Sequence, residues 1–172
     1  MPRTRIPLVV GNAIEILGII VAISLIVAAS NVNGALVSFL FYLISLLCLV
    51  FFPHCLAHFI VGRLAGIRFS HYEISKPSMT KLRLPFVSAV AARLPVLRLR
   101  IDRRSLGTVS RGARAATYSA GAVASMILPF FVPVAAFRRL PVAWGLGLLL
   151  FSLANLCFDL YYSTKAGDLS RI

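Results

Sequence analysis

The sequence of 172 residues is poor in cysteine and in acidic residues. Its three cysteines, Cys48, Cys55 and Cys157, all lie in apolar stretches. Neither a disulfide framework nor a zinc site of paired cysteines can be built from them. Five acidic residues stand against 18 basic ones, which gives a formal net charge of +13. Internal repeats and low-complexity linkers are also lacking, so a single domain of residues 1–172 accounts for the chain.

Long apolar runs are what the sequence has instead. It is 59% hydrophobic, with a mean hydropathy of +0.90, and the apolar residues come in blocks rather than in alternation. The first block exceeds the roughly 20 residues that cross a bilayer. It is too long for the core of a signal peptide and leads straight into another apolar stretch. We therefore expect an all-α integral membrane protein, a bundle of four transmembrane helices at about 8–30, 36–67, 112–137 and 141–163.

The second block is too long for one straight crossing, and it contains Pro53. Because proline removes a backbone hydrogen bond, a kink is predicted just before His54.

The basic residues orient the spans. All Lys and Arg except Arg138 and Arg139 lie in the N-terminal tail, in residues 63–114 or in the C-terminal tail. With four spans these segments share one side, so the positive-inside rule places both termini and the loop 68–110 in the cytoplasm, with the protein in the cell membrane. The charge then reflects topology and attraction to the anionic lipid bilayer. A nucleic-acid partner is not expected, because no binding module is present.

The loop 68–110 alternates basic and apolar residues in two stretches, Lys81 to Leu84 and Leu97 to Ile101. Period-two alternation predicts short strands with one face on lipid or on the bundle. Prolines at 77, 85 and 95 favour edge strands, and the apolar stretch between, Val87 to Ala92, is expected to dip into the interface. The loop is thus a strand-containing, membrane-associated unit on the cytoplasmic side.

Two histidines, His54 and His58, lie four residues apart in the second apolar block. At this spacing both imidazoles leave one helical face and can bind one metal ion. In the zinc-protease signature the residue after the first histidine is glutamate, whereas this chain has Cys55. The alternative for the pair is two core histidines satisfied by hydrogen bonds.

Ionisable groups inside spans are costly unless they are paired or hydrated. Glu15 lies about eight residues into the first span and His58 about eight residues before the cytoplasmic end of the second, so both are about 12 Å deep. Asp159 lies near the same end of the fourth span. We expect a polar site in the cytoplasmic half of the bilayer, drawn from Asn12, Glu15, His54, His58, Asn155 and Asp159. Alternatively, Glu15 is hydrogen-bonded to Asn12 or to a neighbouring helix, and Cys55 is an apolar filler.

Residues 53–68 resemble the metal-binding helix of the site-2 protease family of intramembrane zinc metalloproteases, whose pattern is H-E-x-x-H. Residues 118–125 look like that family's A-G-P-x-A-N segment, with Ala122 and Ser125 in place of Pro and Asn. On the residues alone, Gly121 and its small neighbours are sufficiently explained by close helix packing. The resemblance covers about residues 50–168.

The family's third motif, N-x-x-P followed by D-G, is matched less well. Asn155 is followed by Phe158 where Pro is expected, then by Asp159 and later by Asp168. The resemblance implies that one of these acids is the third zinc ligand. Asp159 is favoured because it is still within the span, and Asp168 is the alternative because a short tail can fold back.

The resemblance implies zinc held by two histidines and a carboxylate, with the glutamate after the first histidine acting as general base. A thiol is largely protonated at neutral pH, so Cys55 is a poor substitute. We therefore expect a degenerate member of the family, proteolytically inactive, that keeps the metal-binding scaffold. Its expected role is that of a regulatory or structural membrane subunit that holds a transmembrane protein partner.

Two other functions remain open from the sequence. The first is an active metalloprotease with a relocated carboxylate base, for which Glu15 is the candidate, acting on a transmembrane substrate. The second is a membrane subunit whose His54 and His58 bind haem or another metal. Haem usually needs axial ligands on opposite faces of its ring, which two histidines on one helix do not supply.

Overall fold

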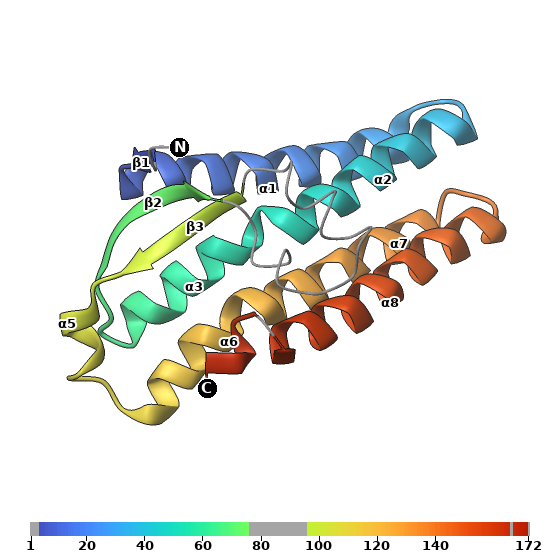
Figure 1. Ribbon diagram of the computed structural model, residues 1–172. Helices are drawn as coiled ribbons and strands as arrows, with labels where there is room; N and C mark the ends of the chain where they lie inside the picture. The colour runs from blue at the N-terminus through green and yellow to red at the C-terminus, as the bar shows by residue number, and fades with distance from the viewer. Residues whose placement is uncertain (1–3, 76–95, 166, 172) are drawn as a thin grey trace.

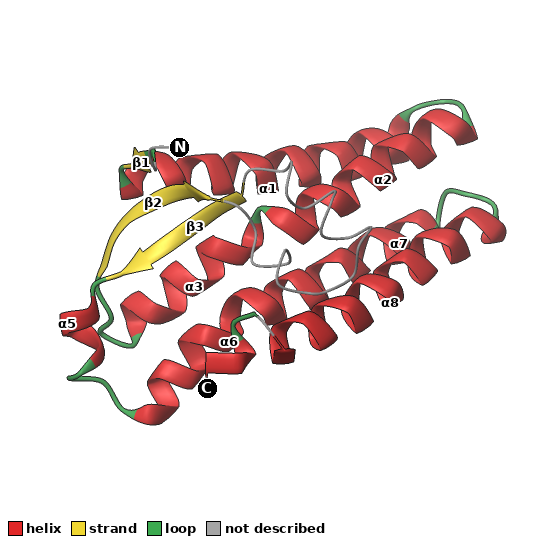
Figure 2. Ribbon diagram, in the orientation of Figure 1, coloured by secondary structure: helices red, strands yellow, loops and turns green. Residues whose placement is uncertain are grey.

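The computed structural model describes residues 4–75, 96–165 and 167–171 and is mainly helical (Figure 1). Long helices run alongside one another, and a small sheet lies at the end of the bundle where the N-terminus is found (Figure 2). The principal helices are α1 (Leu8–Asn31), α2 (Ala35–Phe51), α3 (Pro53–Leu64), α6 (Arg111–Ile127), α7 (Phe131–Ala136) and α8 (Val142–Lys165).

Among the described residues, four helical segments are long and apolar enough to cross a membrane. Their bounds are Leu8–Asn31, Ala35–Leu64, Arg111–Ala136 and Val142–Lys165, within a few residues of the predicted spans. Large apolar side chains on all four face outward, for example Val9, Leu40, Phe131 and Leu150. An exposed apolar perimeter around a helical bundle is what a lipid-facing surface requires.

Prolines divide two of the four segments. The second breaks at Phe52, so that α2 ends and Pro53 starts α3, as predicted from the sequence. The third is interrupted by the short 3-10 helix η2 (Leu128–Phe130), which separates α6 from α7. The first break matters most for function because His54 follows it directly.

The apolar core lies in the half of the bundle remote from the sheet. Small residues on α1 let α2 approach, and Ser45 Oγ donates to the Ala22 carbonyl at 2.8 Å. Phe39 and Trp144 pack against this core and meet edge to face, with ring centroids 4.9 Å apart. The buried cluster consists of Ala22, Ala29, Tyr42, Leu46, Leu49, Val132, Ala136, Leu140 and Leu148.

The sheet has three antiparallel strands in the order β1 (Arg5–Ile6), β2 (Phe69–Ser75) and β3 (Val96–Ile101). Strand β3 confirms the strand predicted at Leu97 to Ile101. The predicted strand at residues 81–84 and the apolar stretch 87–92 lie outside the described residues. The sequence analysis did not anticipate β1 and β2, which are too short or too irregular in pattern to be read from alternation alone.

Tyr72 of β2 attaches the sheet to α1. Its ring is fully buried, its hydroxyl donates to Asn12 Oδ1 at 2.7 Å, and a Cβ at Gly11 would lie only 2.1 Å from the ring. Next to Tyr72 on β2, the buried Glu73 forms an ion pair with Arg100 of β3, which lies diagonally across from it. The sheet is thus fixed to the same end of the bundle as α3.

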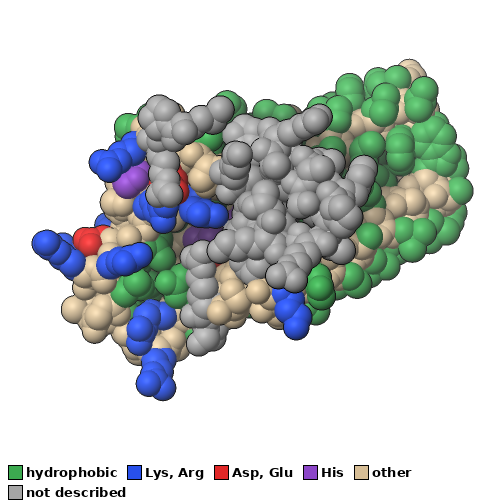
Figure 3. All heavy atoms as spheres, viewed as in Figure 1, with side chains coloured by type: hydrophobic (Ala, Val, Ile, Leu, Met, Phe, Trp, Pro, Cys, Tyr) green, Lys and Arg blue, Asp and Glu red, His purple; other side chains and the backbone are tan. Residues whose placement is uncertain are grey.

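The molecule has two chemically different ends (Figure 3). Basic side chains gather where the sheet, α3 and the short helix α5 (Arg103–Leu106) meet, whereas the visible face of the opposite end shows apolar side chains. The exposed Arg138 and Arg139 lie in the turn between α7 and α8 at that opposite end. This separation agrees with the distribution of basic residues along the sequence.

Candidate metal centre

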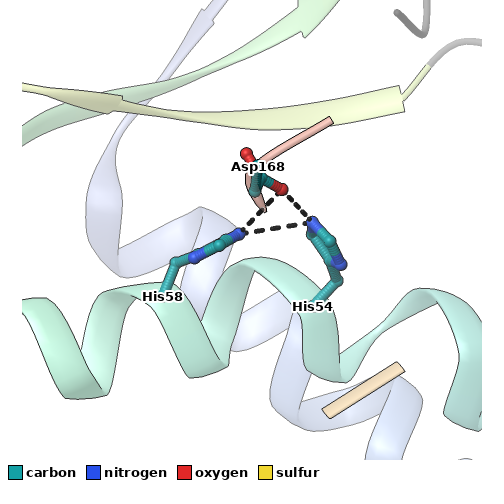
Figure 4. Close-up of side chains that lie close together, drawn as sticks. All are labelled: His54, His58 and Asp168. Carbon is teal, nitrogen blue, oxygen red and sulfur yellow. Dashed lines mark hydrogen bonds and ion pairs between the residues drawn. The ribbon is translucent and has the colours of Figure 1, made fainter. Parts of the chain in front are cut away.

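His54 and His58 lie one turn apart on α3, and their rings turn toward the same point (Figure 4). Their Nε2 atoms are 3.3 Å apart. Both nitrogens approach from a single helix, so they are not placed on opposite faces of a haem ring. The predicted meeting of the two histidines is therefore present.

Asp168 completes the group. It follows α8 and precedes the short helix η3 (Leu169–Arg171). Its Oδ2 atom lies 3.2 Å from His54 Nε2 and 3.3 Å from His58 Nε2 (Figure 4). Of the two acids considered from the sequence, Asp168 is thus the one in contact with both histidines.

The three atoms form a nearly equilateral triangle with edges of 3.2 to 3.3 Å. A tetrahedral zinc ion with bonds of about 2.0 Å separates its ligand atoms by about 3.3 Å. The triangle therefore matches one face of a zinc tetrahedron, with a fourth position left open. His54 and Asp168 keep 34% and 23% of their side-chain surface exposed, so the group is not fully enclosed.

Helix α6 orients both imidazoles through their other nitrogens. His58 Nδ1 lies 2.6 Å from the Thr117 carbonyl, which can only accept, so Nδ1 carries a proton and donates it. His54 Nδ1 lies 3.0 Å from Ser125 Oγ. When His54 Nδ1 likewise donates to Ser125 Oγ, both Nε2 atoms present lone pairs, the form in which histidine binds metal.

Three lone-pair atoms that meet without a hydrogen between them repel one another. Burial raises the pKa of Asp168, but without a metal a proton on an imidazole Nε2 forms a hydrogen bond with the carboxylate, and these bonds and the attraction to His54 and His58 hold the net pKa below the usual range. Asp168 is therefore an anion at neutral pH. A cation held by His54, His58 and Asp168 would relieve the repulsion and would satisfy all three acceptors at once.

Two glycines make room for this arrangement. A Cβ at Gly121 of α6 would lie 2.2 Å from His58 Nε2, so only glycine leaves space for the ring. A Cβ at Gly167 would lie 2.7 Å from the Ser163 backbone, and the Gly167 amide donates to the Tyr162 carbonyl at 3.0 Å. The close approach at Gly167 turns the chain back over α8 and delivers Asp168 to the histidines.

Asp159 and Asn155 lie nearby on α8 but do not join the triangle. Asp159 is half-buried and close enough to His54 to interact with it electrostatically. Asn155 Nδ2 donates to the Ser125 carbonyl at 3.0 Å and so supports the residue that orients His54.

Glu15 of α1 and Cys55 of α3 do not join the His-His-Asp group. The Glu15 carboxyl group is 2% exposed and faces the backbone N–H groups of Cys55 and Leu56. The Cys55 thiol, 7% exposed, donates to the Leu97 carbonyl of β3 at 3.4 Å. The predicted polar site is therefore divided in two, with Asn12 and Glu15 apart from the His-His-Asp group.

Sequence reasoning missed Thr117, Ser125 and the role of Gly121. Thr117 acts through its carbonyl, so its side chain gave no signal. The sequence analysis explained Gly121 by close helix packing. A glycine that makes space for a histidine ring gives the same sequence pattern as a glycine that lets two helices approach. Ser125 was noted only where the resemblance expects asparagine.

Comparisons of this chain with protein-family models, with curated proteins and with solved structures find no match. The described residues define a helical protein that has four helices long and apolar enough to cross a membrane and a His-His-Asp group that could hold a metal ion.

Replacing Gly121 with alanine is expected to displace His58 and to weaken zinc binding by about 10- to 100-fold, the range seen when groups that orient ligands are lost. Gly112→Ala is the matched control, because it lies on the same helix and a Cβ there meets nothing within 4 Å. Competition with a chromogenic chelator measures both affinities. Equal affinities for the two variants would show that Gly121 does not place His58.

Asp168→Asn and Asp159→Asn separate the two candidate third ligands. Loss of the Asp168 carboxylate should remove most of the bound zinc, because a neutral amide is a weak ligand, while Asp159→Asn should retain it. Zinc per chain, measured on purified protein, decides the matter. The opposite ranking would move the third ligand to α8.

Proposed function

We propose that His54, His58 and Asp168 bind one zinc ion inside a four-span membrane protein. The observation that carries the proposal is the triangle of acceptor atoms with edges of 3.2 to 3.3 Å. Two imidazoles and one carboxylate are a donor set that zinc accepts readily, and a fourth position open to solvent is typical of catalytic rather than structural zinc.

The arrangement of helices and strands around this site supports a relationship to the site-2 protease family. The two histidines lie on a helix of the second span, a Gly-containing helix packs on them, and a short sheet borders the same helix. We propose that the chain is a divergent protein of this type. Its termini and basic end then lie in the cytoplasm, against the anionic face of the cell membrane.

Within this type we propose that ordinary proteolysis is lost. Position 55, where the family has its base, carries a thiol that is buried and hydrogen-bonded to β3. Zinc without a base can still hold the helices together and can present an exchangeable position to a partner. The role that follows is a regulatory or structural subunit that holds a transmembrane partner.

A second candidate is an active intramembrane metalloprotease with a relocated carboxylate base. One observation favours it, the half-buried Asp159 beside His54. Glu15, which sequence reasoning singled out for this task, faces backbone amides instead. A base must reach hydrogen-bond distance of the proton that it takes, which makes Asp159 the better placed of the two acids.

The first experiment is metal content by elemental mass spectrometry on protein purified in mild detergent. We expect about one zinc per chain, from the one three-ligand group that the described residues form. The zinc should be lost in a His54→Ala, His58→Ala double variant that keeps its helical circular dichroism. The same zinc content in both proteins would place the metal elsewhere, and no metal in either after zinc loading would remove the proposed site.

Proteolysis is tested with a helical transmembrane substrate in reconstituted vesicles. The zinc-loaded protein is expected to leave the substrate intact, because Cys55 is not available as a base. Cleavage that is lost in Asp159→Asn while zinc is retained would overturn the inactive assignment and establish the relocated base.

A further inference from the structure

The break between α2 and α3 lies where the site needs rigidity. Pro53 has no N–H, and the first turn of any helix leaves backbone N–H groups without intrahelical partners. In a bilayer these groups need partners from the protein. His54 is the first residue after Pro53, so any tilt of this turn moves the first metal ligand.

Helix α1 contacts the break at two positions three residues apart on one of its faces. Gly18 receives the Phe52 ring, whose Cγ would lie 2.1 Å from a Cβ at that position. Glu15 directs its carboxyl group at the N–H groups of Cys55 and Leu56 in the first turn of α3. One contact thus holds the residue before Pro53, and the other holds the turn after it.

The burial of Glu15 is otherwise costly. The side chain is 2% exposed, and its Oε2 atom has no hydrogen-bond partner among the described residues. No basic side chain shares an ion pair with it in the described part of the chain. The N–H groups in the first turn of α3, and the positive end of the helix dipole of α3, stabilise the buried carboxyl group of Glu15.

We propose that Glu15 is a positioning residue that caps the N-terminal turn of α3 and, together with the Gly18 notch for Phe52, holds the helix break in place. Its consequence for metal affinity rests on the proposed zinc site. The clamp itself does not, because it acts on the helix whether or not a metal is bound.

The cap and the base hypotheses make opposite predictions for Glu15→Gln. A carboxamide oxygen accepts from N–H groups as a carboxylate does, so a cap survives the change. A general base does not, because the amide cannot take a proton. Glu15→Ala removes both functions.

The test uses the reactivity of Cys55 in a background with Cys48→Ala and Cys157→Ala, which leaves Cys55 as the one thiol. Cys55 lies in the turn that Glu15 caps, and it reacts only when this turn opens. N-ethylmaleimide, which is small and crosses membranes, is the reagent. We expect slow reaction in the background protein and in Glu15→Gln, and reaction about fivefold faster in Glu15→Ala, the ratio that loss of a typical cap implies.

Gly18→Ala provides an independent arm, since it pushes Phe52 away without touching Glu15, and it should also speed the reaction. Gly147→Ala is the control, because a Cβ there meets nothing within 4 Å. Reaction of Glu15→Ala or Gly18→Ala at the background rate would overturn the clamp. Reaction of Glu15→Gln as fast as Glu15→Ala would also overturn it, because charge rather than an acceptor atom would then matter.

Zinc affinity of the same variants separates this proposal from the proposed function. If the parent binds zinc, Glu15→Ala should bind it more weakly and Glu15→Gln should match the parent. If the parent binds no zinc, the metal site fails while the thiol rates still decide whether Glu15 holds the break.

Discussion

The site depends on the close approach of three side-chain acceptor atoms that come from two distant parts of the chain. His54 Nε2, His58 Nε2 and Asp168 Oδ2 lie within 3.3 Å of one another, although only five acidic residues occur in 172. Because His58 Nδ1 donates its proton to a carbonyl, Nε2 of the neutral ring carries a lone pair that is free to bind a metal ion. A cation bound between these atoms would satisfy all three of them, and the neighbouring helices hold the three side chains in this arrangement.

Three neighbouring helices constrain the site. Helix α6 supplies the Thr117 carbonyl, the Ser125 hydroxyl and the space at Gly121. Helix α8 supplies Asn155, which braces Ser125, and the tight turn at Gly167 that carries Asp168 back. Helix α1 lies against the break that precedes His54. The residues of the His-His-Asp group are thus held by contacts from α1, α6 and α8.

Much of this fold could be predicted from the sequence because the relevant forces are local. Long apolar runs determine the four spans, Pro53 determines the break, and the alternation at residues 97–101 determines β3. The spacing of His54 and His58 places both on one face whatever surrounds them. These features need only a helix or strand period and the length of chain that crosses a bilayer.

The remainder depends on contacts between segments far apart in the sequence. The choice between Asp159 and Asp168 turns on the close approach at Gly167, which a span-by-span analysis does not show. Glu15 was expected near the histidines because its depth matched theirs, but depth does not say which side of α3 it faces. Thr117 contributes a backbone atom and leaves no side-chain pattern at all.

The central claim concerns which atoms bind the metal, and X-ray absorption spectroscopy of the zinc-loaded protein tests it most directly. The account predicts a shell of nitrogen and oxygen ligands at about 2.0 Å with the outer-shell scattering of two imidazoles. A sulfur ligand at about 2.3 Å would assign Cys55 or another cysteine to the metal and would contradict the account.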